Sequence, residues 1–136
     1  MSDRHEILIV DDEAIVCDRL KVFLEADGHR VETLVDPAEA LHLLESRVFD
    51  IVISDIRMGE IDGIQIMEKV FEKSGHTKVI VITGYATLEL AREALTKGAF
   101  DFIAKPFKMK EIRATIKKAT EALQQGIHPS ANTAGA

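Results

Sequence analysis

Apolar and polar positions follow two different spacings along this chain. Four short runs are almost entirely apolar, and a fifth, at 30–35, alternates between apolar and polar residues. The stretches between these runs carry apolar residues every three or four positions. Short β-branched runs predict strands buried on both faces, and the wider spacing predicts amphipathic helices. The predicted strands span 6–10, 30–35, 50–55, 78–82 and 100–104, and the predicted helices span 14–27, 37–46, 64–71, 88–95 and 109–123.

Residues that favour helix ends stand between these elements. Gly28 and Gly98 follow predicted helices as C-cap glycines, and Asp36, Pro37 and Glu39 form a typical helix start. Strands that alternate with helices imply a parallel sheet with right-handed crossovers and helices on both faces. The sequence therefore predicts an α/β protein with a doubly wound, five-stranded parallel sheet. We expect the flavodoxin-like strand order 2-1-3-4-5 and three α/β/α layers.

Composition suits one compact domain. The chain has 136 residues, 46% of them hydrophobic, so we place one compact domain in 1–125 and predict a disordered tail or the start of a linker in 126–136. No apolar run approaches the roughly 20 residues that span a bilayer, and we expect a soluble, cytoplasmic protein without membrane contact. The net charge of -6 argues against nucleic-acid binding by this domain. The single cysteine, Cys17, excludes a disulfide framework and predicts a small buried side chain.

Chemically capable side chains stand where four of the predicted strands end. Asp11 and Asp12 follow the first strand, Asp55 ends the third, Thr83 follows the fourth and Lys105 follows the fifth. Parallel strands of one sheet end at the same edge, and open α/β sheets bind their ligands there. We therefore expect these five side chains to form one site.

Three carboxylates and one ammonium group in such a site favour phosphate chemistry. Carboxylates a few ångströms apart repel one another by roughly 4 kcal/mol per pair at an effective dielectric constant near 20. A hard divalent cation relieves this repulsion, and Mg²⁺, with Mn²⁺ as a substitute, keeps coordination positions for a substrate phosphate. A carboxylate can also accept a phosphoryl group as an acyl phosphate. The strand ends thus predict a metal-assisted phosphoryl-transfer site.

The same residues resemble the receiver domain of bacterial two-component response regulators. The resemblance implies that Asp55 is the phosphoacceptor. It also implies that Asp12, Asp55 and the backbone carbonyl of Arg57 bind Mg²⁺, with Asp11 acting on the ion mainly through water. The likeness extends to about residue 123 and rests on Asp11-Asp12, Asp55, Thr83-Gly84 and Lys105-Pro106-Phe107.

Further roles follow from the resemblance. Thr83 and Lys105 would contact the phosphoryl oxygens, and Phe102 would be the aromatic switch residue, without the hydroxyl group of the frequent Tyr. The Lys105-Pro106 peptide bond would be cis, as is usual in the family. The phosphoryl donor would be a histidine kinase. Phosphorylation would alter the face formed by the fourth helix, the fifth strand and the fifth helix.

The implied outputs are an attached output domain, a partner protein or a homodimer formed on activation. The stretches 83–89 and 98–103 resemble receivers of the nitrogen-regulatory class that are attached to AAA+ transcription activators, which implies transcriptional regulation. A homodimer could form cross-partner ion pairs, which are individually weak at a surface, and the alternative interpretation of the same residues is a solvated mixed-charge surface. The candidates for such pairs are Glu89, Arg92, Lys97, Asp101, Glu111 and Arg113.

One position departs from the family pattern. The family usually has Met-Pro after the phosphoacceptor loop, and this chain has Met58-Gly59. Glycine does not fix φ as proline does, so we expect a looser loop. The resemblance also implies that Arg57 and Tyr85, which flank the site, influence the lifetime of the acyl phosphate.

Two other functions use similar parts. A Mg²⁺-dependent phosphatase of the haloacid-dehalogenase type also has an Asp nucleophile at a strand end, but it needs an Asp-x-Asp pattern on the first strand. Here Asp11 and Asp12 are adjacent. A flavodoxin-like FMN carrier needs a phosphate-binding loop after the first strand, where acids would repel the flavin phosphate. Both alternatives therefore fit the sequence less well than a receiver domain, which is a phosphoacceptor and not an enzyme acting on other molecules.

Overall fold

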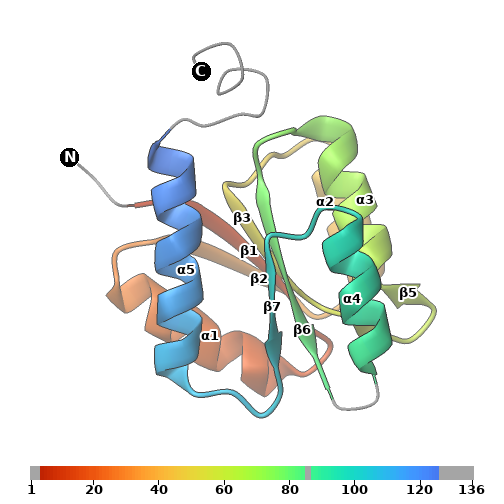
Figure 1. Ribbon diagram of the computed structural model, residues 1–136, viewed down its shortest axis with the longest axis horizontal. Coiled ribbons are helices and arrows are strands. Elements are labelled where there is room, and N and C mark those ends of the chain that lie inside the picture. Colours follow the sequence, from red (N-terminus) through yellow and green to blue (C-terminus); the bar gives the residue numbers. More distant parts are fainter. Residues whose placement is uncertain (1–3, 85–86, 126–136) are drawn as a thin grey trace.

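A central parallel sheet organises the structure, a computed structural model that describes residues 4–84 and 87–125. Five strands lie in the order β2-β1-β3-β6-β7, with helices on both faces (Figure 1). The predicted fold class and strand order are confirmed, because β6 and β7 are the fourth and fifth strands of this sheet. The strands are β1 (Glu6–Val10), β2 (Arg30–Leu34), β3 (Ile51–Asp55), β6 (Lys78–Thr83) and β7 (Asp101–Ala104).

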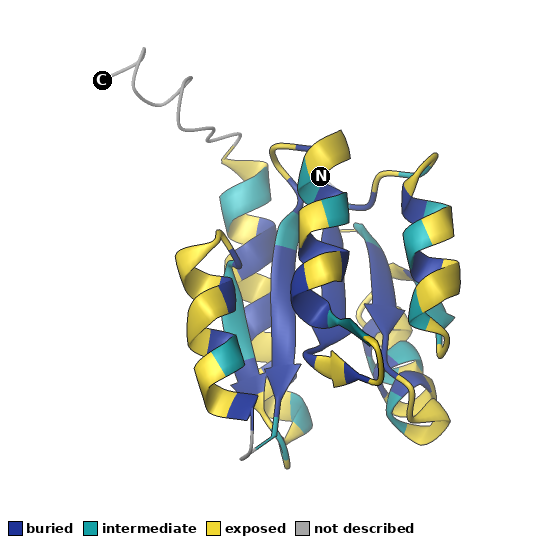
Figure 2. Ribbon diagram, turned by 90° about the vertical axis from the view of Figure 1, so that its right-hand side faces the viewer, coloured by how far each residue is buried: buried dark blue, intermediate teal, exposed yellow. Residues whose placement is uncertain are grey.

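The strand β3 is the centre of the sheet. All five of its residues are buried, and Val52 pairs with Leu8 of β1 on one side and with Val79 of β6 on the other. The β-branched residues of the strand therefore pack on both faces, as the apolar run predicts. Figure 2 shows this buried sheet between helices whose outer surfaces are exposed.

The helices divide into two groups. The helices α1 (Ala14–Ala26) and α5 (Met109–Gln124) cover one face of the sheet. The opposite face is covered by α2 (Pro37–Leu44), α3 (Gly63–Lys73) and α4 (Leu88–Thr96) (Figure 1). Each group encloses its own apolar core, and the sheet separates the two cores.

The loop after β3 contains structure that the sequence pattern did not predict. Two short strands, β4 (Arg57–Met58) and β5 (Ile61–Asp62), pair as an antiparallel hairpin. Gly59 in the connecting turn has φ of 83°, a left-handed conformation that proline cannot adopt. Asp62 then starts α3 through a capping box with Gln65. The glycine thus forms a defined tight turn, and strands of two residues are too short to give a periodic pattern.

Four smaller predictions concern Cys17, a membrane-spanning segment, the tail and Tyr85. The Cys17 side chain is 1% exposed, as predicted, and its thiol donates to the Asp11 carbonyl oxygen at 3.3 Å. None of the described helices is both long and apolar enough to cross a membrane. The predicted tail in 126–136 and Tyr85 lie outside the described residues.

Candidate functional site

The ends of the strands bring the predicted acids together at one edge of the sheet. Asp11 and Asp12 follow β1, and Asp55 is the last residue of β3. One carboxylate oxygen from each of the three lies within 4.8 Å of the other two. Asp11 and Asp55 are buried, and Asp12 is exposed. We call these three residues the acid cluster.

Lys105 follows β7 and reaches into the acid cluster. Its Nζ lies 3.3 Å from Asp11 Oδ2, 3.3 Å from Asp55 Oδ2 and 2.8 Å from Glu13 Oε1. Burial opposes the charged form of Lys105, but the hydrogen bond to Glu13 and the charges of Asp11 and Asp55 raise its pKa well above the ordinary value. Lys105 therefore stays protonated and provides one positive charge within the cluster. The Lys105-Pro106 bond is cis, as predicted.

Asp11 is the most constrained carboxylate of the site. It is 0% exposed, and its Oδ1 accepts the backbone N–H of Glu13 at 2.9 Å. Its Oδ2 accepts no hydrogen bond from any described residue. The pKa of Asp11 is raised to about 6, mainly by burial and further by the charge of Asp55. The hydrogen bond from the Glu13 backbone N–H and the charge of Lys105 lower it by a smaller amount. This buried oxygen is paired with the Lys105 ammonium group at 3.3 Å, and it keeps lone-pair positions that a second cation can use.

Asp55 lies beside Asp11 at the end of the central strand. Burial raises the pKa of Asp55, while Lys105 and a hydrogen bond from the backbone N–H of Arg57 lower it. Its side chain has 12% of its surface exposed, so it remains reachable from solvent. Gly63 packs closely against the Asp55 backbone: a Cβ added at Gly63 would lie 2.6 Å from the Asp55 carbonyl oxygen.

Thr83 and Phe102 lie on the two strands β6 and β7, and their side chains contact different residues. Thr83 ends β6, the neighbour of β3, and is 1% exposed. Its hydroxyl contacts Gly84 and Thr87, and no hydrogen bond between it and the acid cluster is found among the described residues. Phe102 pairs with Val81 in the sheet and packs, half-buried, against the core beneath α4. Thr83 is thus linked to the start of α4, and Phe102 packs on the same face of the sheet as α4.

Glu13 is a site residue that the sequence analysis did not single out. Its side chain forms the shortest of the three Lys105 contacts, and this hydrogen bond lowers the pKa of Glu13. The only signal in the sequence is its place directly after Asp11 and Asp12. Residues at the end of one strand share one edge of the sheet, so Glu13 belongs with them.

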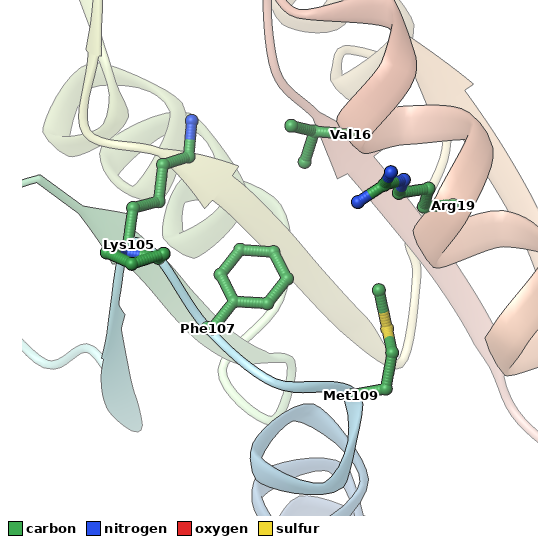
Figure 3. Close-up of a pocket in the computed structure, with 6 residues that line it drawn as sticks. Val16, Arg19, Lys105, Phe107 and Met109 are labelled. Carbon is green, nitrogen blue, oxygen red and sulfur yellow. The ribbon is translucent and has the colours of Figure 1, made fainter.

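A pocket of about 370 Å³ opens beside the acid cluster. Figure 3 shows Val16 and Arg19 of α1 on one side and Phe107 and Met109 on the other, with the Lys105 side chain extending along its edge. A second hollow continues the apolar surface along α1 to Ile15 and Val22, which are 63% and 71% exposed. Large exposed apolar side chains near a polar site are typical of surfaces that bind other proteins.

The acid cluster has the donor set for a hard divalent cation. Its ligands are all oxygen atoms, one buried oxygen lacks a hydrogen bond, and Lys105 neutralises only part of the negative charge. Asp11, Asp12 and Asp55 could therefore hold a metal ion next to the exposed part of the Asp55 carboxylate.

The chain matches a known protein family over most of its length. The model of the response regulator receiver domain matches residues 7–117. This range includes every element from β1 to the middle of α5, and it contains the acid cluster and Lys105.

Curated relatives are named as transcriptional regulators. The chain is 36% identical over 117 residues to the transcriptional regulatory protein ZraR of Escherichia coli, covering 86% of this chain and 26% of ZraR. It is 37% identical over 121 residues to the regulatory protein AtoC of Escherichia coli, covering 89% of this chain and 26% of AtoC. The chain thus spans about a quarter of the length of these relatives.

Solved structures agree with the family match. A receiver domain protein from Clostridium thermocellum aligns with a TM-score of 0.83 at 29% identity, over 90% of this chain and 98% of that one. NtrX from Brucella abortus, solved in complex with ADP, aligns with a TM-score of 0.83 at 30% identity, over 90% of this chain and 28% of NtrX.

The matches also decide between the functions considered from the sequence. The resemblance to receivers of the nitrogen-regulatory class is confirmed by the matches to ZraR, AtoC and NtrX. The family match and the structural neighbours identify a signalling domain instead of a haloacid-dehalogenase phosphatase or a flavodoxin. The chain belongs to the response regulator receiver domain family.

Proposed function

We propose that this protein is a phosphorylation-activated switch in which Asp55 accepts a phosphoryl group from the phosphohistidine of a histidine kinase. The observation that supports this most strongly is the partly exposed Asp55 carboxylate, with Lys105 Nζ 3.3 Å away and the buried Asp11 beside it. We also propose that it works in the cytoplasm as part of a transcriptional regulator, because its curated relatives carry such names.

The transfer needs a nucleophile and compensation of charge. An Asp55 oxygen attacks phosphorus, the P–N bond to histidine breaks, and the imidazole nitrogen leaves with the electron pair. Lys105 provides a positive charge for the phosphoryl oxygens. Asp11, Asp12, Asp55 and the carbonyl of Arg57 would hold Mg²⁺, which neutralises charge on the transferring oxygens. Mn²⁺ has the same preference for oxygen ligands and would substitute.

The donor would approach over α1. The pocket and the exposed side chains of Ile15 and Val22 lie on this side of the acid cluster, and an apolar surface beside the acceptor suits a protein donor.

The response would appear at the β7 edge of the sheet, where α4 lies on one face and α5 on the other. A phosphoryl group on Asp55 attracts the Thr83 hydroxyl, Phe102 turns into the vacated space, and the surface of α4, β7 and α5 changes for an output domain, a partner protein or a second copy. Several residues considered for cross-partner ion pairs already bond within the chain: Lys97 with Glu93, Arg113 with Asp27, and Asp101 with the backbone of Phe102. A homodimer would therefore need to exchange these bonds or rely on apolar contacts such as Leu88 and Leu95, which are exposed on α4.

The proposed function is tested by chemical phosphorylation. Incubation with acetyl phosphate and Mg²⁺ is expected to add one phosphoryl group, detected by intact mass spectrometry and located by peptide mapping. Chelation of Mg²⁺ with EDTA is expected to slow the addition by about two orders of magnitude, because charge on the transferring oxygens is then neutralised by Lys105 alone. Excess Mg²⁺ added back should restore the rate. A protein that gains no phosphoryl group with Mg²⁺ present would contradict the proposal.

Metal affinity is expected to depend on pH through Asp11. Its pKa in the folded protein is about 6, compared with an ordinary value of 3.8. Protons therefore compete with Mg²⁺ below neutral pH, and the apparent Kd for Mg²⁺ should rise about tenfold from pH 7 to pH 5, as measured by calorimetric titration. Between the two pKa values the folded, metal-free protein binds more protons than the unfolded chain, so its free energy of unfolding should fall as pH rises from about 4 to about 6.

Asp11→Asn provides the control for this pH dependence. The variant lacks the titrating carboxylate, so its weaker Mg²⁺ affinity should change little between pH 7 and pH 5. A wild-type Kd that is also independent of pH would show that Asp11 does not bind the proton that competes with the metal.

A further inference from the structure

Thr87 has a buried hydroxyl group to which the proposed mechanism assigns no role. It occupies the N-cap position of α4, directly before Leu88, and is 7% exposed. A threonine at this position usually accepts a hydrogen bond from a backbone N–H of the first helical turn. The Thr87 side chain makes no such bond. Its hydroxyl is instead bonded to residues at the end of β6.

Thr83, Gly84 and Thr87 form a compact set of hydrogen bonds, which we call the hydroxyl cluster. Thr87 Oγ1 lies 2.6 Å from Thr83 Oγ1 and accepts the backbone N–H of Gly84 at 3.0 Å. Both hydroxyl oxygens lie close to the Gly84 carbonyl oxygen, Thr83 at 3.0 Å and Thr87 at 3.1 Å. The cluster connects the end of β6 to the start of α4.

Both hydroxyl protons are used inside this cluster. The Gly84 carbonyl oxygen already accepts the backbone N–H of Thr87 at 3.1 Å, so its second lone pair has room for one hydroxyl. One of the two hydroxyls therefore donates to this carbonyl, and the other donates to the first hydroxyl. In either assignment the Thr83 proton is bound to Gly84 or Thr87 and is not directed at the acid cluster.

The oxygens of a phosphoryl dianion accept hydrogen bonds and donate none. Thr83 can bind them only by donating its proton, which requires its present bond to break. We propose that Thr87 is a positioning residue that holds the Thr83 hydroxyl in the unphosphorylated protein and competes for it with the phosphoryl group on Asp55. This inference rests on the proposed role of Thr83 in binding the phosphoryl group. It makes the start of α4 a determinant of how readily the switch responds.

The competition is measurable with beryllium trifluoride, an analogue of the phosphoryl group that binds to a carboxylate without forming a lasting product. The full chain is titrated at fixed Mg²⁺ and followed by the amide signals in NMR spectra. Thr87→Val keeps the shape of the side chain and leaves the Thr83 hydroxyl with one partner, the Gly84 carbonyl oxygen, in place of two. The affinity of this variant is therefore expected to be about threefold to tenfold higher than that of the wild type. Thr87→Ser keeps the hydroxyl and should restore the wild-type affinity.

A matched control and a second background separate this role from a general effect on the fold. Thr96 is an exposed threonine of the same helix whose hydroxyl bonds to the Arg92 carbonyl oxygen, so Thr96→Val should bind like the wild type. In a Thr83→Ala background, Thr87→Val should have no further effect, because the hydroxyl that Thr87 holds is absent. Thr87→Ala serves as a second variant if Thr87→Val is destabilised in chemical denaturation.

Two results would overturn the inference: an affinity of folded Thr87→Val equal to or below that of the wild type, or an equal increase in the Thr83→Ala background. If the wild type binds the analogue and these variants fail the test, only the role of Thr87 is wrong. If the wild type neither binds the analogue nor accepts a phosphoryl group from acetyl phosphate, the proposed function and the inference both fail.

Discussion

Asp55→Asn is expected to accept no phosphoryl group from acetyl phosphate, with a signal below about 1% of the wild-type level in intact mass spectra. The amide has no anionic oxygen to attack phosphorus, so the acyl phosphate cannot form. The substitution also removes one of the three carboxylates that could hold the metal ion. Lys105 keeps its contacts with Asp11 and Glu13, so the fold should persist.

Asp50→Asn is the matched control for this variant. Asp50 directly precedes β3, at the opposite end of the strand from Asp55, and its Oδ2 accepts the backbone N–H of Glu6 at 2.8 Å. Asparagine retains an acceptor oxygen there, so this variant should be phosphorylated like the wild type. A phosphoryl group found on Asp55→Asn would assign the chemistry to another residue and contradict the proposal.

Gly63→Ala is expected to lower the free energy of unfolding by about 2–3 kcal/mol. The added Cβ would lie 2.6 Å from the Asp55 carbonyl oxygen and 3.0 Å from Ile56 Cα, and both are backbone atoms that cannot turn away. The loss corresponds to a decrease of roughly 10 °C in Tm, measurable by thermal unfolding. Because the clash involves the backbone of Asp55, the rate of phosphorylation should fall as well.

Gly75→Ala tests whether this cost comes from the close approach and not from the loss of a glycine. An added Cβ at Gly75 would meet nothing within 4 Å. We therefore expect its free energy of unfolding to stay within about 0.5 kcal/mol of the wild-type value. Equal stability of the two variants would mean that α3 moves away from β3 without cost.

The main elements could be predicted from the sequence because their patterns are long and local. The strand β3 begins with three apolar residues, and all five of its residues are buried. The predicted end of α1 differs from the observed end by one residue. The meeting of Asp11, Asp55 and Lys105 followed from one topological rule, namely that parallel strands end at the same edge. That rule places residues in a region but assigns no hydrogen bonds.

The remaining features depend on contacts that no local pattern encodes. Glu13 bonds to Lys105 across 92 positions of the chain. The hairpin of β4 and β5 depends on the left-handed conformation of one glycine, Gly59. At Thr87 the local rule predicts a helix cap, and the tertiary contact with Thr83 replaces it. At Thr87 the geometry of the fold thus outweighs the preference of the residue itself.

The sheet separates two apolar cores, and this division affects how partners can assemble on the protein. The pocket beside Lys105 lies on the side of α1 and α5, whereas Phe102 packs beneath α4 on the opposite side. A donor seated over α1 would leave α4 uncovered. An output partner could then bind before the donor has dissociated, and the donor, this protein and the output partner could form a ternary complex without a steric clash. Selection could also change the specificity for the donor and for a partner bound to α4 independently, because α1 and α4 lie on opposite faces of the sheet.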